Sequence, residues 1–107
     1  MRYITASIVV AGLIIAAGAA AADMPDLARK NGCVVCHSID KKLVGPAWMD
    51  VAKKYKGDAG AEARLVAKVS KGGSGVWGTT AMPPLDPSGK KQDDIKQLVQ
   101  FILDLAK

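Results

Sequence analysis

The spacing of hydrophobic residues is most regular near the C-terminus. Over residues 92–106, one face of a helical projection holds Ile95, Leu98, Val99, Ile102 and Ala106. Residues three, four, seven and eleven apart share a helix face, so this spacing predicts an amphipathic helix. Residues 61–71 show the same pattern more weakly, and Gly72 follows them as a stop signal. The pattern therefore predicts helices over residues 92–106 and 61–71.

Two shorter helices are predicted from the residues at their ends. Residues 23–30 begin with acidic side chains and a proline, which favour a helix start, and an Asn-Gly pair ends them. A second short helix is predicted from Pro46 or Ala47 to about Tyr55, with proline again at its first turn. Residues 72–88 are rich in glycine and proline and are predicted to form a long, irregular loop. No run alternates as a strand would, so the sequence predicts the all-α class.

The N-terminal segment has the pattern of a secretory signal. Of residues 1–22, 17 are apolar; Arg2 precedes the apolar run, and small residues with an Ala-x-Ala sequence follow it. An uncleaved membrane anchor is the alternative, but the run is short for a membrane span. We therefore predict a signal peptide over residues 1–22 and one exported, periplasmic domain over residues 23–107, without stable membrane association after cleavage.

The predicted mature domain has few residues from which to build a core. It holds 36 apolar residues in 85, and its aromatic residues are Trp48, Tyr55, Trp77 and Phe101. Domains of this size usually need a disulfide, a metal or a bulky bound group for stability. The composition excludes a multidomain enzyme, a coiled coil and a disulfide-dense scaffold.

The sequence Cys33-Val34-Val35-Cys36-His37 carries the candidate chemistry. Two cysteines three apart, followed at once by histidine, are typical of c-type haem attachment, in which the thiols add to the porphyrin vinyl groups and the imidazole binds the iron. A redox-active dithiol would not need the histidine. A zinc site would need two more ligands, yet the chain has no other cysteine or histidine. A disulfide across so few residues would constrain little of the unfolded chain.

A second axial ligand is expected among the methionines. Met24 lies close to Cys33 in sequence, and Met49 falls in a predicted helix. Met82 lies in the loop, followed by two prolines that stiffen the backbone. A thioether is a weak ligand that needs a rigid support, so we favour Met82 over a role as core filler.

Four stretches of the chain form a recognisable set: Asn31-Gly32-Cys33-Val34-Val35-Cys36-His37, Val44-Gly45-Pro46-Ala47, Gly72-Gly73-Ser74-Gly75-Val76-Trp77-Gly78 and Met82-Pro83-Pro84. Together they resemble the small bacterial class I cytochromes c of the cytochrome c-551/c-552 type. The resemblance covers about Met24 to Lys107, and its most specific part is Gly-Val-Trp-Gly followed by Met-Pro-Pro. The resemblance implies about four short helices wrapped around one covalently attached haem c.

The resemblance also implies roles for individual residues. Cys33 and Cys36 would form the thioethers, and His37 and Met82 would be the axial pair. Pro46 would accept a hydrogen bond from His37 Nδ1–H through its carbonyl, which fixes the imidazole tautomer.

Two further positions match residues that bind a haem propionate in this family. They are Trp77, whose alternative role is an ordinary core aromatic, and Lys68. The sequence also departs from the family pattern. Leu85 replaces a residue that often hydrogen-bonds the methionine sulfur, and residues 86–92 are longer and more charged than in relatives, which would shift the start of the last helix.

The implied function is one-electron transfer through a His/Met-ligated haem, without catalysis, in a respiratory or denitrifying chain. Expected partners are a cytochrome oxidase, nitrite reductase or peroxidase, with cytochrome bc1 as donor, and the protein is expected to be a monomer. Partners would dock on an apolar rim of Val34, Val35, Leu43, Val44, Pro83 and Pro84. The basic residues near it in sequence, Arg29, Lys30, Lys41 and Lys42, would steer acidic partners; the alternative for each lysine is an ordinary solvated surface charge. Without Arg2 the charge falls from +5 to +4, and two propionates would lower it further, so nucleic-acid binding is not implied.

Two alternatives remain open at this point. One is a haem enzyme or gas-binding sensor with an open sixth coordination site. The other is a subunit or tethered electron donor of a larger oxidase or reductase.

Overall fold

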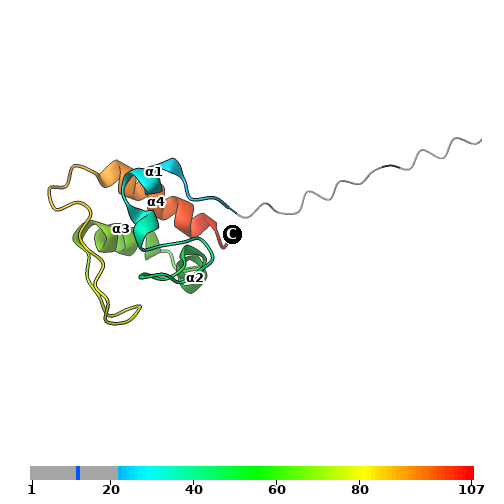
Figure 1. Cartoon of the computed structure of the whole chain (residues 1–107), viewed down its shortest axis with the longest axis horizontal. Coiled ribbons are helices and arrows are strands. Elements are labelled where there is room, and N and C mark those ends of the chain that lie inside the picture. Colours follow the sequence, from blue (N-terminus) through cyan, green and yellow to red (C-terminus); the bar gives the residue numbers. More distant parts are fainter. Residues whose placement is uncertain (1–11, 13–21) are drawn as a thin grey trace, which may run out of the picture.

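Four α-helices and one 3-10 turn form the regular structure of residues 22–107, which with Gly12 are the part of the chain that the computed structural model describes (Figure 1). The predicted signal peptide, residues 1–22, lies almost entirely outside the described residues. Within them, no helix is long and apolar enough to cross a membrane. The elements are α1 (Asp26–Lys30), η1 (Cys33–Val35), α2 (Trp48–Lys54), α3 (Ala61–Lys71) and α4 (Gln92–Asp104).

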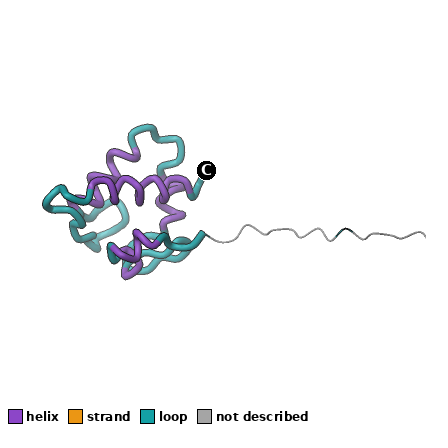
Figure 2. Tube along the Cα trace, turned by 90° about the horizontal axis from the view of Figure 1, so that it is seen from above, coloured by secondary structure: helices purple, strands orange, loops and turns teal. Residues whose placement is uncertain are grey.

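The helices agree closely with the sequence predictions. Helix α3 has the predicted bounds, and α4 begins at Gln92 as predicted, without the shift that the longer preceding segment suggested. Helix α1 begins only after Pro25, whose extended backbone (ψ 152°) keeps it outside the helix. Helix α2 begins after Ala47 for the same reason (ψ 137°). Apart from two isolated bridges, the described residues form no strand, and the predicted all-α class is confirmed (Figure 2).

Helix α4 is the centre of the fold because it contacts α1, α2 and α3. Its apolar face supplies Ile95 and Val99, which are completely buried, together with Leu98 and Ile102. This is the face that the hydrophobic spacing predicted. The C-terminal helix therefore holds the other helices in place.

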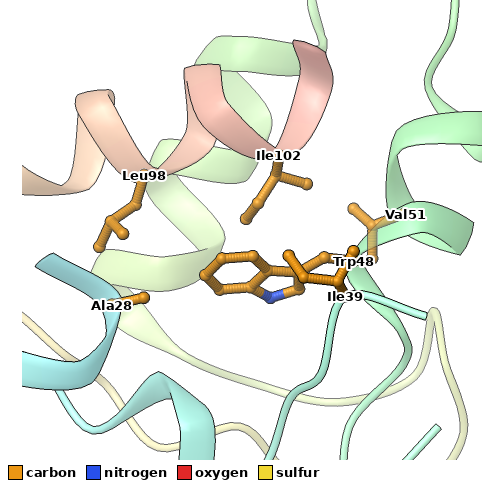
Figure 3. Close-up of a cluster of buried hydrophobic side chains, with 6 residues drawn as sticks. All are labelled: Ala28, Ile39, Trp48, Val51, Leu98 and Ile102. Carbon is orange, nitrogen blue, oxygen red and sulfur yellow. The ribbon is translucent and has the colours of Figure 1, made fainter. Parts of the chain in front are cut away.

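Trp48 fills the middle of a hydrophobic cluster between three helices and a loop (Figure 3). Figure 3 shows Leu98 and Ile102 of α4 on one side of the indole, Ala28 of α1 at one end, and Ile39 and Val51 at the other. Its ring also lies 5.9 Å from the ring of Phe101, edge to face, and 6.0 Å from the ring of His37. Trp48 thus connects the core to the histidine of the Cys-x-x-Cys-His sequence.

The chain between α3 and α4 makes a long excursion away from the helices, drawn in yellow in Figure 1. At its base, Gly73 and Met82 pair as an isolated antiparallel bridge. Two backbone hydrogen bonds of 2.9 Å join them, one in each direction. The loop predicted over residues 72–88 is therefore an ordered, closed excursion rather than a slack connection.

Candidate functional site

One apolar hollow collects the residues that the sequence singled out. About 1040 Å³ of empty space, including open solvent, lies between α2, α3, α4, the Cys33–His37 segment and the 73–82 excursion. Its helical lining includes Trp48, Val51, Leu65, Val69, Leu98 and Val99. Cys33, Cys36, His37, Pro46, Lys68, Trp77 and Met82, all the predicted site residues, also line it.

The two cysteines are held by a tight turn. Gly32 adopts the left-handed conformation (φ 74°), and the 3-10 turn η1 begins directly after it. The backbone N–H groups of Cys36 and His37 both donate to the carbonyl of Cys33, at 3.2 and 2.9 Å. This folding brings two free, half-buried thiols and the imidazole to one side of the hollow.

The environment of Cys33 differs from that of a redox-active thiol. Burial is the main cause that raises the pKa of the Cys33 thiol, and the neighbouring Cys36 raises it further. Reactive dithiols instead have a lowered cysteine pKa. Among residues 22–107, moreover, no three histidine, cysteine or acidic side chains lie close enough to hold a metal ion. Neither the dithiol nor the zinc interpretation gains support.

His37 is oriented by a hydrogen bond of the kind that the resemblance implies. Its Nδ1 lies 2.8 Å from the carbonyl oxygen of Pro46. A carbonyl oxygen only accepts, so Nδ1 carries the proton. In the neutral ring, Nε2 then keeps a free lone pair, which is the state in which an imidazole binds a metal.

Gly45, for which the sequence pattern predicts no role of its own, makes this position of His37 possible. A Cβ on Gly45 would lie 2.5 Å from Cε1 and 2.9 Å from Nδ1 of the imidazole. Side chains do not approach so closely, so any larger residue would displace the ring or the backbone. The loop before α2 therefore packs its bare backbone against the imidazole.

Met82 is the methionine that lines the hollow. Of the other two methionines among residues 22–107, Met24 packs against the hydrophobic cluster and Met49 lies on α2, and neither faces the hollow. The bridge to Gly73 fixes the Met82 backbone. Gly72 permits a second close approach, since a Cβ there would collide with the Met82 carbonyl oxygen.

Trp77 and Lys68 lie at the open side of the hollow. Trp77 is 40% exposed, so it is not an ordinary core aromatic; that place belongs to Trp48, which is 4% exposed. Lys54 Nζ lies 5.7 Å from the centre of the Trp77 ring, a cation–π contact that the sequence did not reveal. Lys68 Nζ lies close to Gly73, at the base of the excursion. An amine and an indole therefore border the entrance.

Several large hydrophobic side chains are exposed, and two of them, Val44 and Val76, also line the hollow. Val35 is 74% exposed and Val44 58%, and Val34, Leu43 and Val76 are exposed as well. Large hydrophobic side chains gathered on a surface commonly mark a contact site. Of the rim predicted from the sequence, Val44 and Pro83 line the hollow, as do Val76 and Trp77, whereas Val34, Val35 and Leu43 are exposed without lining it. Docking at this rim stays a prediction.

Comparison with known proteins places this arrangement in a family. The family model described as Cytochrome c matches residues 17–106. The chain belongs to the cytochrome c family. It is 56% identical to cytochrome c-551 of Allochromatium vinosum over 79 residues, which are 74% of this chain and 82% of that protein. It is 43% identical to cytochrome c-551 of Pseudomonas aeruginosa over 101 residues, 94% of each chain.

Solved structures agree with the sequence comparison. The crystal structure of wild-type Nitrosomonas europaea cytochrome c552 superimposes with a TM-score of 0.69 and is 44% identical. The alignment covers 75% of this chain and 96% of that one. The predicted resemblance to the c-551/c-552 type and the class I cytochrome c fold are therefore confirmed.

Membership in the family brings a cofactor that the hollow fits. Cytochromes c are electron-transport proteins with haem c attached covalently through cysteine, and this chain has only two cysteines. The hollow offers what such a group needs: apolar walls, two free thiols, and one nitrogen and one sulfur donor. The relatives named above are small electron carriers rather than enzymes.

Proposed function

We propose that this chain is exported, loses residues 1–22, and works in the periplasm as a monohaem, one-electron carrier. Residues 23–107 form the functional domain in this proposal. The signal-like composition of residues 1–22 supports export. The family supports electron transport.

The convergence of Cys33, Cys36, His37 and Met82 on one hollow carries this proposal. We assign the two cysteines as the thioether residues, and His37 Nε2 and the Met82 sulfur as the two axial donors. Haem c, when bound, supplies an Fe(II)/Fe(III) couple. With His37 and Met82 as its two protein ligands, the iron would offer no open position to a substrate, so the chain would carry electrons and catalyse no reaction.

The residues around the donors adjust their properties. The Pro46 carbonyl holds the Nδ1 proton of His37 and so raises the electron-donating strength of Nε2. The apolar walls lower the local dielectric constant and disfavour an added positive charge. We assign Trp77 and Lys68 to the propionates, because an indole N–H and an ammonium group at the entrance can bind carboxylates there.

Partners would dock at the apolar rim of the entrance. The basic residues near it in sequence, Arg29, Lys30, Lys41 and Lys42, are all exposed and would attract an acidic partner surface. We propose that a monomer exchanges electrons with proteins such as a cytochrome oxidase, nitrite reductase or peroxidase, with cytochrome bc1 as a possible donor. Nucleic acid has no place in this function.

Spectroscopy of the haem-loaded protein tests the axial assignment. The ferric wild type should show the near-infrared band of methionine bound to iron, and the ferrous protein should not bind CO readily. Met82→Ala should lose the band, lower the potential and bind CO. Met49→Ala is the matched control, since Met49 does not line the hollow, and it should behave as the wild type. A high-spin wild type that binds CO readily would instead favour the open sixth site of a haem enzyme or sensor.

A further inference from the structure

The segment between Met82 and α4 holds a buried acidic side chain that the proposed function does not use. Asp86 is only 5% exposed, although it lies in a loop. Aspartate is seldom so buried unless its carboxylate is paired. Among residues 22–107, however, no lysine or arginine forms an ion pair with it.

Hydrogen bonds from neutral groups satisfy the Asp86 carboxylate instead. The backbone N–H of Lys90 donates to Oδ1 at 2.9 Å, and that of Lys91 to Oδ2 at 3.0 Å. The Gln92 side chain donates to Oδ2 at 2.7 Å. These donors lower the pKa of Asp86, the Gln92 amide most of all. The carboxylate is thus charged and held from several directions.

The same network reaches across to α3. The Gln92 amide also lies 2.9 Å from Ser70 Oγ, which in turn donates to the carbonyl of Val66 at 2.7 Å. Two backbone hydrogen bonds also join the loop to α3: Leu85 N–H donates to the Val69 carbonyl at 3.0 Å, and Asp86 N–H donates to the Ser70 carbonyl at 3.2 Å. Asp86 therefore ties the loop both to the end of α3 and to the start of α4.

Only three residues separate this anchor from Met82. Two of them are Pro83 and Pro84, whose rings fix the backbone φ angle and leave little slack. On its other side, Met82 is fixed by the bridge to Gly73. The third residue, Leu85, has no polar side-chain group that could hold the methionine sulfur, and its backbone N–H is already bonded to Val69. The direction of Met82 thus depends on the bridge to Gly73 on one side and, on the other, on the closure of the loop against α3 and α4 at Leu85 and Asp86.

We propose that Asp86, through Gln92 and Ser70, is a positioning residue that keeps the Met82 sulfur on the iron. The inference rests on the proposed function, in which Met82 is an axial ligand. Loosening the anchor should make it easier for the sulfur to leave, so that an external ligand replaces it more readily.

Competition with imidazole in the ferric, haem-loaded protein measures this effect. Asp86→Asn removes the charge and one acceptor while keeping the shape of the side chain. A hydrogen bond to a charged group contributes enough for its loss to raise imidazole affinity about tenfold or more. Asp93→Asn is the matched control, because Asp93 is an exposed acid at the start of α4 and makes the same charge change. It should leave the affinity unchanged.

A second control separates positioning from general loss of stability. Ile39→Val trims the hydrophobic cluster without touching the hollow or the loop, so it lowers the unfolding midpoint alone. An equal rise in imidazole affinity for Ile39→Val, or no rise for Asp86→Asn, would overturn the inference. If Asp86→Asn does not yield folded protein, Gln92→Ala decides, with a rise in affinity expected. A wild type without the methionine-to-iron band would refute the axial assignment itself.

Discussion

Replacing Gly45 with alanine tests how closely the backbone must approach His37. The new Cβ would lie 2.5 Å from Cε1 of the imidazole, too close for any real contact. Gly45 does not have a positive φ angle, so alanine meets no backbone strain there and the clash is the whole perturbation. Overpacking of this kind costs about 1–3 kcal/mol.

Either the imidazole ring or the backbone must move to relieve the clash, and both movements affect His37. If the ring turns away, the hydrogen bond to Pro46 is lost, which costs about 1 kcal/mol and weakens His37 as an electron donor. A weaker donor favours Fe(II), so the reduction potential should rise. If the backbone moves instead, Pro46 moves with it and the same hydrogen bond lengthens.

The assay combines denaturant unfolding with potentiometry of the haem-loaded protein. Gly60→Ala is the matched control: Gly60 also lacks a positive φ angle, and its Cβ would come no closer than 3.4 Å to Arg64. We expect Gly45→Ala to lose about 1–3 kcal/mol of stability and to raise the potential, and Gly60→Ala to leave the potential unchanged. Wild-type stability and potential in Gly45→Ala would refute the argument.

Three further predictions concern the whole domain. A Cys33→Ser, Cys36→Ser double variant should lack haem, so the walls of the hollow lose their main contact. We expect no cooperative thermal unfolding of this variant by circular dichroism. A native-like melt would contradict this prediction. The lowered pKa of Asp86 stabilises the fold at a pH above about 3.9, the ordinary aspartate value, and this contribution is lost as the pH falls through the folded-state pKa. The free energy of unfolding should therefore fall less steeply with acid for Asp86→Asn than for the wild type. Equal slopes would argue against a stabilising role of the Asp86 charge. Association with an acidic redox partner should slow as salt rises, as stopped-flow kinetics would show, and rates independent of salt would leave the apolar rim as the sole docking element.

The helices could be predicted from sequence because their signals are local. The hydrophobic face of α4 and the stop at Gly72 lie within the helix or directly beside it. The pairing of Gly73 with Met82 has no such signal, because its backbone hydrogen bonds can join any two residues. The 3-10 turn at Cys33–Val35 was missed because three residues are too few to show a period.

Some residues of the site can likewise be predicted from the sequence, and others cannot. Cysteine, histidine and methionine could be named as candidates because only a few side-chain types bind iron or form thioethers. The groups that aim them are mostly backbone atoms, such as the Pro46 carbonyl at His37, and these leave no mark in composition. The sequence marks such close backbone contacts only by glycine: Gly45 lies against the imidazole, and Gly72 lies against the Met82 carbonyl.

Asp86 also supports the site, but no glycine in the sequence marks its contribution. Its position calls for a charged side chain in a buried place, which hydrophobic patterning alone would assign to solvent. Its donors are two backbone N–H groups and an amide on the first residue of α4, so their convergence depends on how the loop closes against α3. The length of residues 86–92, which suggested a displaced helix, instead allows this closure: the chain turns back so that its backbone N–H groups reach the Asp86 carboxylate, and α4 still begins at Gln92.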